Sequence, residues 1–207
     1  PRHLLAAACT LYAASLFANV KLATIFTSNM VLQRDMEVPV WGTAEPGEEV
    51  AVAFAGQNLK TTADDKGDWE VRLAPLAAST NGRPLVVTGK NTITNANVLV
   101  GDVWLCSGQS NMEMMVQHCM NAPDEVAAAD IPMLRLFQVK NTVSPRPLPD
   151  CVAEWKVCRP GTVGNFSAAA YFFGRGIAGE LDVPVGLIHA SWGGTTVETW
   201  MTIAPLS

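Results

Sequence analysis

Basic residues are sparse in this sequence and never form a run. Lysine and arginine together number 14, against 19 aspartates and glutamates, so the formal net charge is −5, and only 16% of the residues are charged. A surface that binds nucleic acid or an anionic membrane needs clustered positive charge. The composition therefore argues against nucleic acid, and against a membrane surface, as the main partner of this protein.

Cysteine and histidine are also scarce, with five and three copies respectively in 207 residues. No two cysteines have the Cys-x-x-Cys spacing, so we expect no zinc site, and nothing in the sequence calls for another metal or a cofactor. In an exported protein, Cys151 and Cys158 could close a small disulfide loop. The alternative is that they are separate reduced thiols. The sequence leaves both alternatives open.

An apolar run without charge covers residues 4–18 and follows Arg2 and His3. A basic start, a short apolar stretch and a small residue at its end are typical of a secretory signal peptide. The run is short for a membrane span, and a buried helix is the other alternative. We therefore expect residues 1–18 to be a signal peptide and the protein to be secreted or periplasmic. Because residue 1 is proline, we also expect the natural N-terminus to lie further upstream.

Residues 19–97 have the pattern of short strands separated by turns. The alternation of apolar and polar residues in 49–54 is typical of a half-buried strand, and Pro46-Gly47 supplies a turn before it. Short strands at this spacing indicate a β-sandwich. The two tryptophans, Trp41 and Trp69, are expected in its core rather than against a sugar ring. The predicted strands cover residues 21–26, 37–41, 48–54, 58–62, 68–73 and 85–89.

From residue 98 the pattern changes to alternating strands and helices. Such alternation predicts an α/β fold, with a parallel sheet, helices on both faces, and sites at the carboxyl ends of the strands. The first strand starts at Val98 and breaks at Ser107-Gly108. The predicted helices cover residues 112–120, 124–129 and 166–181, and the later strands cover 133–139 and 183–190.

Ser110 lies in the turn between the first of these strands and the helix that follows. A serine in such a turn exposes its hydroxyl at the end of a sheet strand, and its own N–H lies where a helix N-terminus collects partial positive charge. These are the two requirements of a nucleophilic serine: access to the substrate and a donor for the developing oxyanion. An ordinary serine that caps a helix is the alternative.

The stretch GDVWLCSGQSNM, residues 101–112, resembles the nucleophile block of the sialate O-acetylesterase family, which are SGNH-type carbohydrate esterases. Met112 stands where α/β-hydrolases have the second glycine of their Gly-x-Ser-x-Gly elbow. Residues 25–34 and 63–69 resemble the jelly-roll-like module of the same family. The resemblance implies an SGNH-hydrolase-like sheet preceded by a small β-sandwich, with expected boundaries of 1–18, 19–97 and 98–207.

A glycine pair follows the strand at 183–190, in the segment SWGGTTVETW of residues 191–200. Paired glycines let a backbone approach a ligand closely, and a free N–H there can serve an oxyanion. The resemblance implies that this segment lies by the active site, with Gly194 as the N–H donor and Gly193 shaping the turn. Glu198 is expected to satisfy nearby backbone donors rather than to bind substrate.

The sequence offers no evident base for Ser110. His118 is eight residues further along the predicted helix, and His189 is expected to be a packed strand residue. The family takes its base from an Asp-x-x-His motif that does not occur here. We therefore expect this chain to be an inactive fragment, incomplete at the C-terminus, with the base encoded further downstream.

The function implied by the resemblance is hydrolysis of O-acetyl esters on sialic acid or a related acetylated glycan. Ser110 would be the nucleophile, and the N–H groups of Ser110 and Gly194 would hold the oxyanion. Two alternatives stay open: an esterase that acts on acetylated xylan, and a non-catalytic carbohydrate-binding protein built on a degenerate esterase fold.

Overall fold

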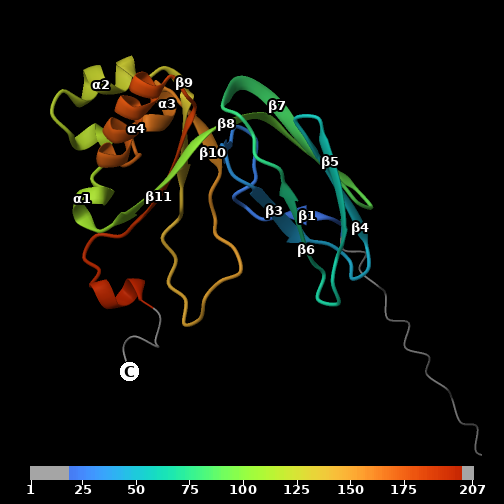
Figure 1. Cartoon of the computed structure of the whole chain (residues 1–207). Helices are drawn as coiled ribbons and strands as arrows, with labels where there is room; N and C mark the ends of the chain where they lie inside the picture. The colour runs from blue at the N-terminus through green and yellow to red at the C-terminus, as the bar shows by residue number, and fades with distance from the viewer. Residues whose placement is uncertain (1–18, 202–207) are drawn as a thin grey trace, which may run out of the picture.

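One long strand, β8 (Thr92–Gly108), runs through both halves of the molecule in the computed structural model (Figure 1). Its first part pairs antiparallel with β7 (Ser79–Thr88), and its last part pairs in parallel with β11 (Val185–Ser191). The boundary expected between residues 97 and 98 lies inside β8, where the strand exchanges one set of partners for the other. The two halves are therefore joined by continuous backbone hydrogen bonding.

The structure describes residues 19–201, so the predicted signal peptide at residues 1–18 lies outside the described residues. The alternation predicted for residues 49–54 is confirmed in β4 (Glu49–Phe54), where inward side chains are buried and outward ones are half-buried or exposed. Strand β6 (Asp68–Leu73) alternates in the same way, with its outward side chains exposed. Strands β1, β3 and β6 form one sheet, whereas β4, β5 and β7 belong to the sheet of β8, and both sheets contribute to one hydrophobic core. The strands are β1 (Lys21–Leu22), β2 (Val31–Gln33), β3 (Val38–Thr43), β4 (Glu49–Phe54), β5 (Gln57–Thr62) and β6 (Asp68–Leu73).

The two tryptophans of this half have different environments. Trp69 is 3% exposed and lies in the core, as predicted. Trp41 is 38% exposed, and its ring packs edge-on against Phe26 with the ring centroids 4.7 Å apart. The prediction that both belong to the core therefore holds for Trp69 and is wrong for Trp41.

The second half alternates strands and helices, as predicted from residue 98 onward. The main sheet has the order β10-β9-β11-β8-β7-β4-β5; β9 and β8 each run parallel to β11, whereas β10 is antiparallel to β9. The sheet is therefore mixed rather than purely parallel. The further elements are α1 (Ser110–Glu113), η1 (Val116–His118), α2 (Ala122–Ala128), β9 (Ile131–Gln138), β10 (Trp155–Cys158), α3 (Pro160–Val163), α4 (Ala168–Leu181) and η2 (Val197–Trp200).

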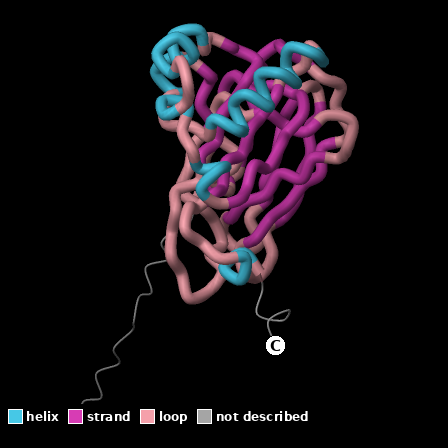
Figure 2. The backbone as a smooth tube through the Cα atoms, turned by 90° about the vertical axis from the view of Figure 1, so that its left-hand side faces the viewer, coloured by secondary structure: helices cyan, strands magenta, loops and turns pink. Residues whose placement is uncertain are grey.

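The prediction of helices on both faces of the sheet is wrong for the part of the chain that the structure describes. Helix α4 packs on β9 and β11, and α1, α2 and α3 gather on the same side (Figures 1 and 2). On the opposite face Phe137, Ile188 and Trp155 join the core of the N-terminal strands. The β-rich half therefore covers the face that helices would otherwise bury. No helix within residues 19–201 is long and apolar enough to cross a membrane.

Arg135 links the two halves from inside the molecule. This β9 residue is 3% exposed, and its guanidinium donates to the carbonyl oxygens of Pro132 at 2.9 Å and Asn29 at 3.1 Å. Burial lowers the pKa of Arg135 to about 10, which leaves the side chain charged at neutral pH. A buried cation needs such acceptors to offset its lost hydration, so the turn that carries Asn29 is held against β9.

The helix predicted over residues 112–120 is interrupted. Helix α1 ends at Glu113, and the chain then continues through an extended stretch to the short 3-10 turn η1. The reason is a long-range pairing with the segment before α4: Ala168 N donates to Met114 O at 2.7 Å, and Val116 N donates to Phe166 O at 3.0 Å. These backbone groups are no longer available for intrahelical hydrogen bonds, so tertiary contacts override the local preference for helix.

Cys151 and Cys158 are both free thiols, so the structure favours the second of the two alternatives left open by the sequence. They lie in different hydrophobic clusters, Cys151 against the core of the β-rich half and Cys158 in the core beneath the helices. Burial raises the pKa of the Cys158 thiol to about 12, so this thiol is protonated and unreactive at neutral pH.

Gly101 allows a tight backbone contact where β8 passes the start of β11. A Cβ at this position would overlap the carbonyl oxygen of Pro184 and lie 2.7 Å from its carbonyl carbon. We expect Gly101→Ala to lower the free energy of unfolding by about 3 kcal/mol, because neither backbone can move without breaking sheet pairing. Urea unfolding of the protein measures this loss.

The matched control is Gly176→Ala in α4, where an added Cβ meets nothing within 4 Å. Alanine is a better helix former than glycine, so the free energy of unfolding of this variant should rise by about 0.5–1 kcal/mol. Equal stabilities for the two variants would contradict the assignment of Gly101 to a close backbone approach.

Candidate active site

Three strands end at the same edge of the main sheet. In the parallel pairing, Gly108 at the end of β8 lies opposite Ser191 of β11, and Gln138 at the end of β9 lies opposite His189 of β11. The segments that follow these ends must therefore lie near one another. They are the start of α1, the glycine turn after β11 and the loop after β9, and each contributes residues to the candidate site.

Ser110 is the first residue of α1 and its side chain is exposed, as expected for a nucleophile at a strand end. Gly108 has a φ of +147°, a backbone conformation that favours glycine and that directs the chain out of β8 into the turn. The hydroxyl of Ser110 donates to Oε1 of Gln109 at 3.1 Å. The structure thus places Ser110 in the predicted strand-to-helix turn, with its hydroxyl accessible from solvent.

The glycine turn lies against the Ser110 turn. Trp192 N donates to Gly108 O at 3.0 Å, and a Cβ added at Gly193 would lie 3.6 Å from the Cα of Ser110. The structure therefore brings together the two segments that the sequence analysis predicted at the site. They are more than 80 residues apart in the sequence, and the parallel pairing of β8 with β11 makes them neighbours.

The two glycines differ in what their N–H groups do. Gly193 N donates to Oε2 of Glu113 at 2.8 Å, so this N–H is already engaged. Gly194 is exposed, has a φ of +76°, and its N–H makes no hydrogen bond to any of the described residues. This difference favours the predicted division of roles, with Gly194 as the available donor and Gly193 shaping the turn.

Neither of the two described histidines is hydrogen-bonded to Ser110. His189 is 3% exposed; its Nε2 lies 2.5 Å from Oγ of Ser191, and its ring packs edge-on against Phe166. Burial lowers the pKa of His189, although the negative charge of Glu113 opposes the shift. The prediction that His189 is a packed strand residue is confirmed. His118 is exposed on η1, beyond the interruption of the helix.

Glu198 lies in η2, immediately after the glycine turn, and its side chain is exposed. A hydrogen bond from the Thr196 side chain, and a second from the backbone N–H of Glu198, lower the pKa of this carboxyl. Both partners belong to the start of the same short helix. This local engagement agrees with the structural role expected for Glu198.

Glu113 and Asn141 are site residues that the sequence analysis missed. Glu113 is the last residue of α1, and Nδ2 of Asn141, in the loop after β9, donates to its Oε1 at 3.4 Å. The rule that sites gather at the carboxyl ends of parallel strands would have indicated Asn141, because it follows the end of β9 by three residues. The spacing of three residues from Ser110 would have placed Glu113 on the same helical turn.

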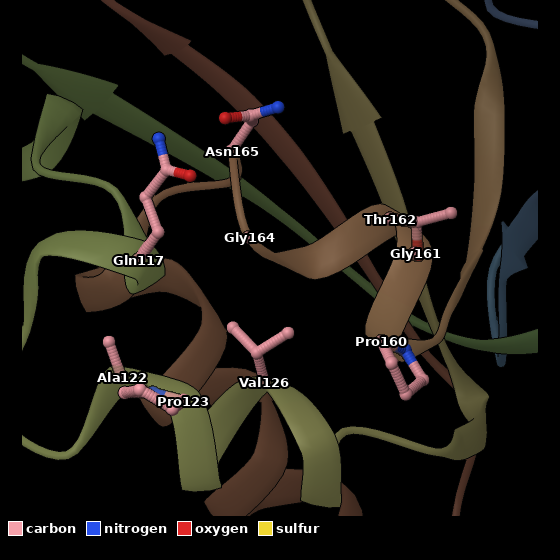
Figure 3. A pocket seen from close by; sticks show the side chains of 9 residues that line it. All are labelled: Gln117, Ala122, Pro123, Val126, Pro160, Gly161, Thr162, Gly164 and Asn165. Carbon is pink, nitrogen blue, oxygen red and sulfur yellow. The ribbon is translucent and has the colours of Figure 1, made fainter.

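Two cavities lie outside the Ser110 turn and the glycine turn. One of about 410 Å³ is bordered by η1, α2 and α3 (Figure 3), and one of about 500 Å³ lies beside it near β9 and β10. Neither is lined by Ser110 or Gly194, so the candidate site occupies an open edge rather than either cavity. Within residues 19–201 no group of three or more His, Cys, Asp or Glu side chains is arranged to hold a metal ion. The residues seen lining the first cavity include Gln117, Pro123, Val126, Thr162 and Asn165.

The fold resembles that of a carbohydrate acetylesterase of known structure. The structure is similar to the crystal structure of a carbohydrate acetylesterase from Xanthomonas citri, with a TM-score of 0.88, 38% sequence identity, and coverage of 90% of this chain and 43% of that one. No protein-family model matches the chain.

The chain is also similar in sequence to curated proteins. The chain is 34% identical to the sialate O-acetylesterase of Mus musculus and 33% identical to that of Homo sapiens, in each case over 87% of its length. It is a homologue of the sialate O-acetylesterases, which confirms the resemblance found in the nucleophile block. The chain spans 37% of the mouse protein and 38% of the human protein.

Proposed function

We propose that the protein carrying this chain is a carboxylic-ester hydrolase that removes O-acetyl groups from sialic acid or a related acetylated glycan. The observation that carries the proposal is the meeting of Ser110 with the Gly193–Gly194 turn at the carboxyl ends of β8 and β11. An exposed hydroxyl beside an unengaged backbone N–H is what acyl transfer from an ester requires. The names of the relatives and of the structural neighbour point to the same chemistry.

In the proposed reaction Oγ of Ser110 attacks the carbonyl carbon of the acetyl ester. The N–H groups of Ser110 and Gly194 bind the oxyanion that forms. The tetrahedral intermediate collapses, the sugar oxygen leaves with a proton, and the acetyl group remains on Ser110. Water then releases acetate and restores the serine. Neither described histidine is hydrogen-bonded to Ser110, so the base would come from the Asp-x-x-His motif that the family resemblance implies.

The remaining expectations belong to the same proposal. Residues 1–18 act as a signal peptide, and the protein is secreted or periplasmic. Residues 19–97 form a jelly-roll-like β-sandwich, a reading supported by two sheets that share one hydrophobic core. Residues 98–207 form the first part of the SGNH-type esterase domain, and no metal or cofactor takes part.

Labelling with a fluorophosphonate tests the nucleophile in the full-length protein. We expect a covalent adduct on Ser110 and none on Ser107, which is also exposed but lies within β8, three residues before Ser110. Peptide mass spectrometry locates the adduct, and heat-denatured protein is the control. A folded protein that binds acetylated glycan but takes no label on Ser110 would instead be a carbohydrate-binding protein.

Acetate release then identifies the substrate class. The labelled sample and its untreated counterpart are assayed on O-acetylated sialic acid and on acetylated xylan. We expect release from the sialic acid, abolished by the label. Acetate release from acetylated xylan alone would show that the protein is an acetylxylan-type esterase and that the proposed sialic acid substrate is wrong.

A further inference from the structure

The carboxylate of Glu113 touches all three segments that form the candidate site. Glu113 itself belongs to α1, three residues after Ser110. Its Oε2 accepts the N–H of Gly193 at 2.8 Å, and its Oε1 accepts from Nδ2 of Asn141 at 3.4 Å. One side chain therefore connects the segments that follow β8, β11 and β9.

Space at Gly193 is arranged around this contact. A Cβ on Gly193 would lie too close to Oε2 of Glu113 for the carboxylate to keep its present position against the N–H. Hydrogen bonds from N–H groups to a charged acceptor are the stronger kind in proteins. The close fit and the charge together make this the strongest attachment described between the glycine turn and α1.

The contact leaves one N–H of the turn available. Glu113 occupies the N–H of Gly193, whereas that of Gly194, the next along the turn, has no partner among the described residues. Donors that stabilise an oxyanion work because they are fixed before the charge develops. A turn whose conformation is free would lose that advantage even if both glycines were present.

We propose that Glu113 is a positioning residue: its carboxylate fixes the Gly193–Gly194 turn relative to Ser110, so that the N–H of Gly194 is held ready for the acetyl oxyanion. The inference rests on the proposed esterase function and assigns to the same site a residue outside the expected nucleophile and donor pair. Glu113 does not touch the reacting atoms. Its effect passes through Gly193, and Asn141 holds the second carboxylate oxygen.

Three substitutions separate this role from a general loss of stability. In full-length protein, Glu113→Ala should lower kcat about 10²-fold, the cost of a misplaced catalytic group, with KM changed less than about threefold. Glu113→Gln should keep kcat within about fivefold of the wild type, because its amide oxygen still accepts the Gly193 N–H. Glu113→Met has a similar length but no comparable acceptor, so it should behave like Glu113→Ala.

The matched control is Glu125→Ala. Glu125 also joins two elements through its carboxylate, since its Oε2 lies 2.7 Å from Nη1 of Arg175 between α2 and α4. It belongs to α2, outside the three segments that form the site. We expect its loss to leave kcat and KM unchanged. Steady-state kinetics on an O-acetylated sialic acid give kcat and KM for these four variants.

The outcomes distinguish the inference from the function on which it rests. If Ser110→Ala abolishes turnover while Glu113→Met matches Glu113→Gln, the positioning role is wrong and the esterase function stands. If Ser110→Ala keeps its turnover, Ser110 is not the nucleophile and the proposed reaction at this site is wrong. Should Glu113→Ala fail to fold, the comparison of the Gln and Met variants still decides, because they differ mainly in the hydrogen-bond acceptor.

Discussion

Ser110→Ala is expected to lower kcat for acetyl-ester hydrolysis about 10⁶-fold in the full-length protein, the loss found when a triad serine is removed from a protease. The reason is that no other hydroxyl is available in the turn after β8, where acyl transfer to the enzyme would take place. Ser110 is exposed and contributes little packing, so the fold should be unchanged. Acetate release and thermal unfolding are measured on the same preparation.

Ser107→Ala is the control for this result. Ser107 is also exposed, but it lies within β8 opposite Ala190 of β11 and has no place in the turn. Its replacement should leave turnover unchanged. A Ser110→Ala protein that kept a tenth or more of the wild-type kcat would show that the nucleophile is another group.

The second large effect is expected at Gly194. Gly194→Val should lower kcat about 10²–10³-fold, the usual cost of losing one oxyanion-hole donor, and should raise KM far less. A Cβ at this position meets nothing within 4 Å, so no collision is involved. The change acts through the backbone, because a φ of +76° is strained for a β-branched residue and the turn must move to relieve the strain.

Gly47→Val separates the loss of a donor from the cost of backbone strain. Gly47 has a φ of +79° and is equally open, but it lies in the turn before β4, in the β-rich half. Both variants should lose about 1–3 kcal/mol of stability from the strained conformation. Only the Gly194 variant should lose kcat. If kcat is normal for both, Gly194 merely forms the turn.

The sequence determined the elements whose signals are local. The alternation in β4 and β6, the strand at the start of the glycine segment and the strand-to-helix turn at Ser110 each depend on residues within a few positions of one another. The nucleophile block was also recognisable as a continuous stretch. Two segments placed after two parallel strands then had to meet at one edge, so the pairing of Ser110 with the glycine turn followed from the pattern.

The tertiary structure decided whatever depended on contacts between distant segments. The helix predicted at 112–120 ends at Glu113, because Met114 and Val116 give their backbone groups to residues some 50 positions away. One face of the sheet is covered by the β-rich half instead of helices. The apolar side chains of that face can be buried equally well by strands or by helices. The spacing from Ser110 indicates that Glu113 shares its helical turn, but nothing local indicates what its carboxylate binds. Its carboxylate acquires a partner only when pairing along β8 and β11 brings Gly193, 80 residues further on, to 2.8 Å.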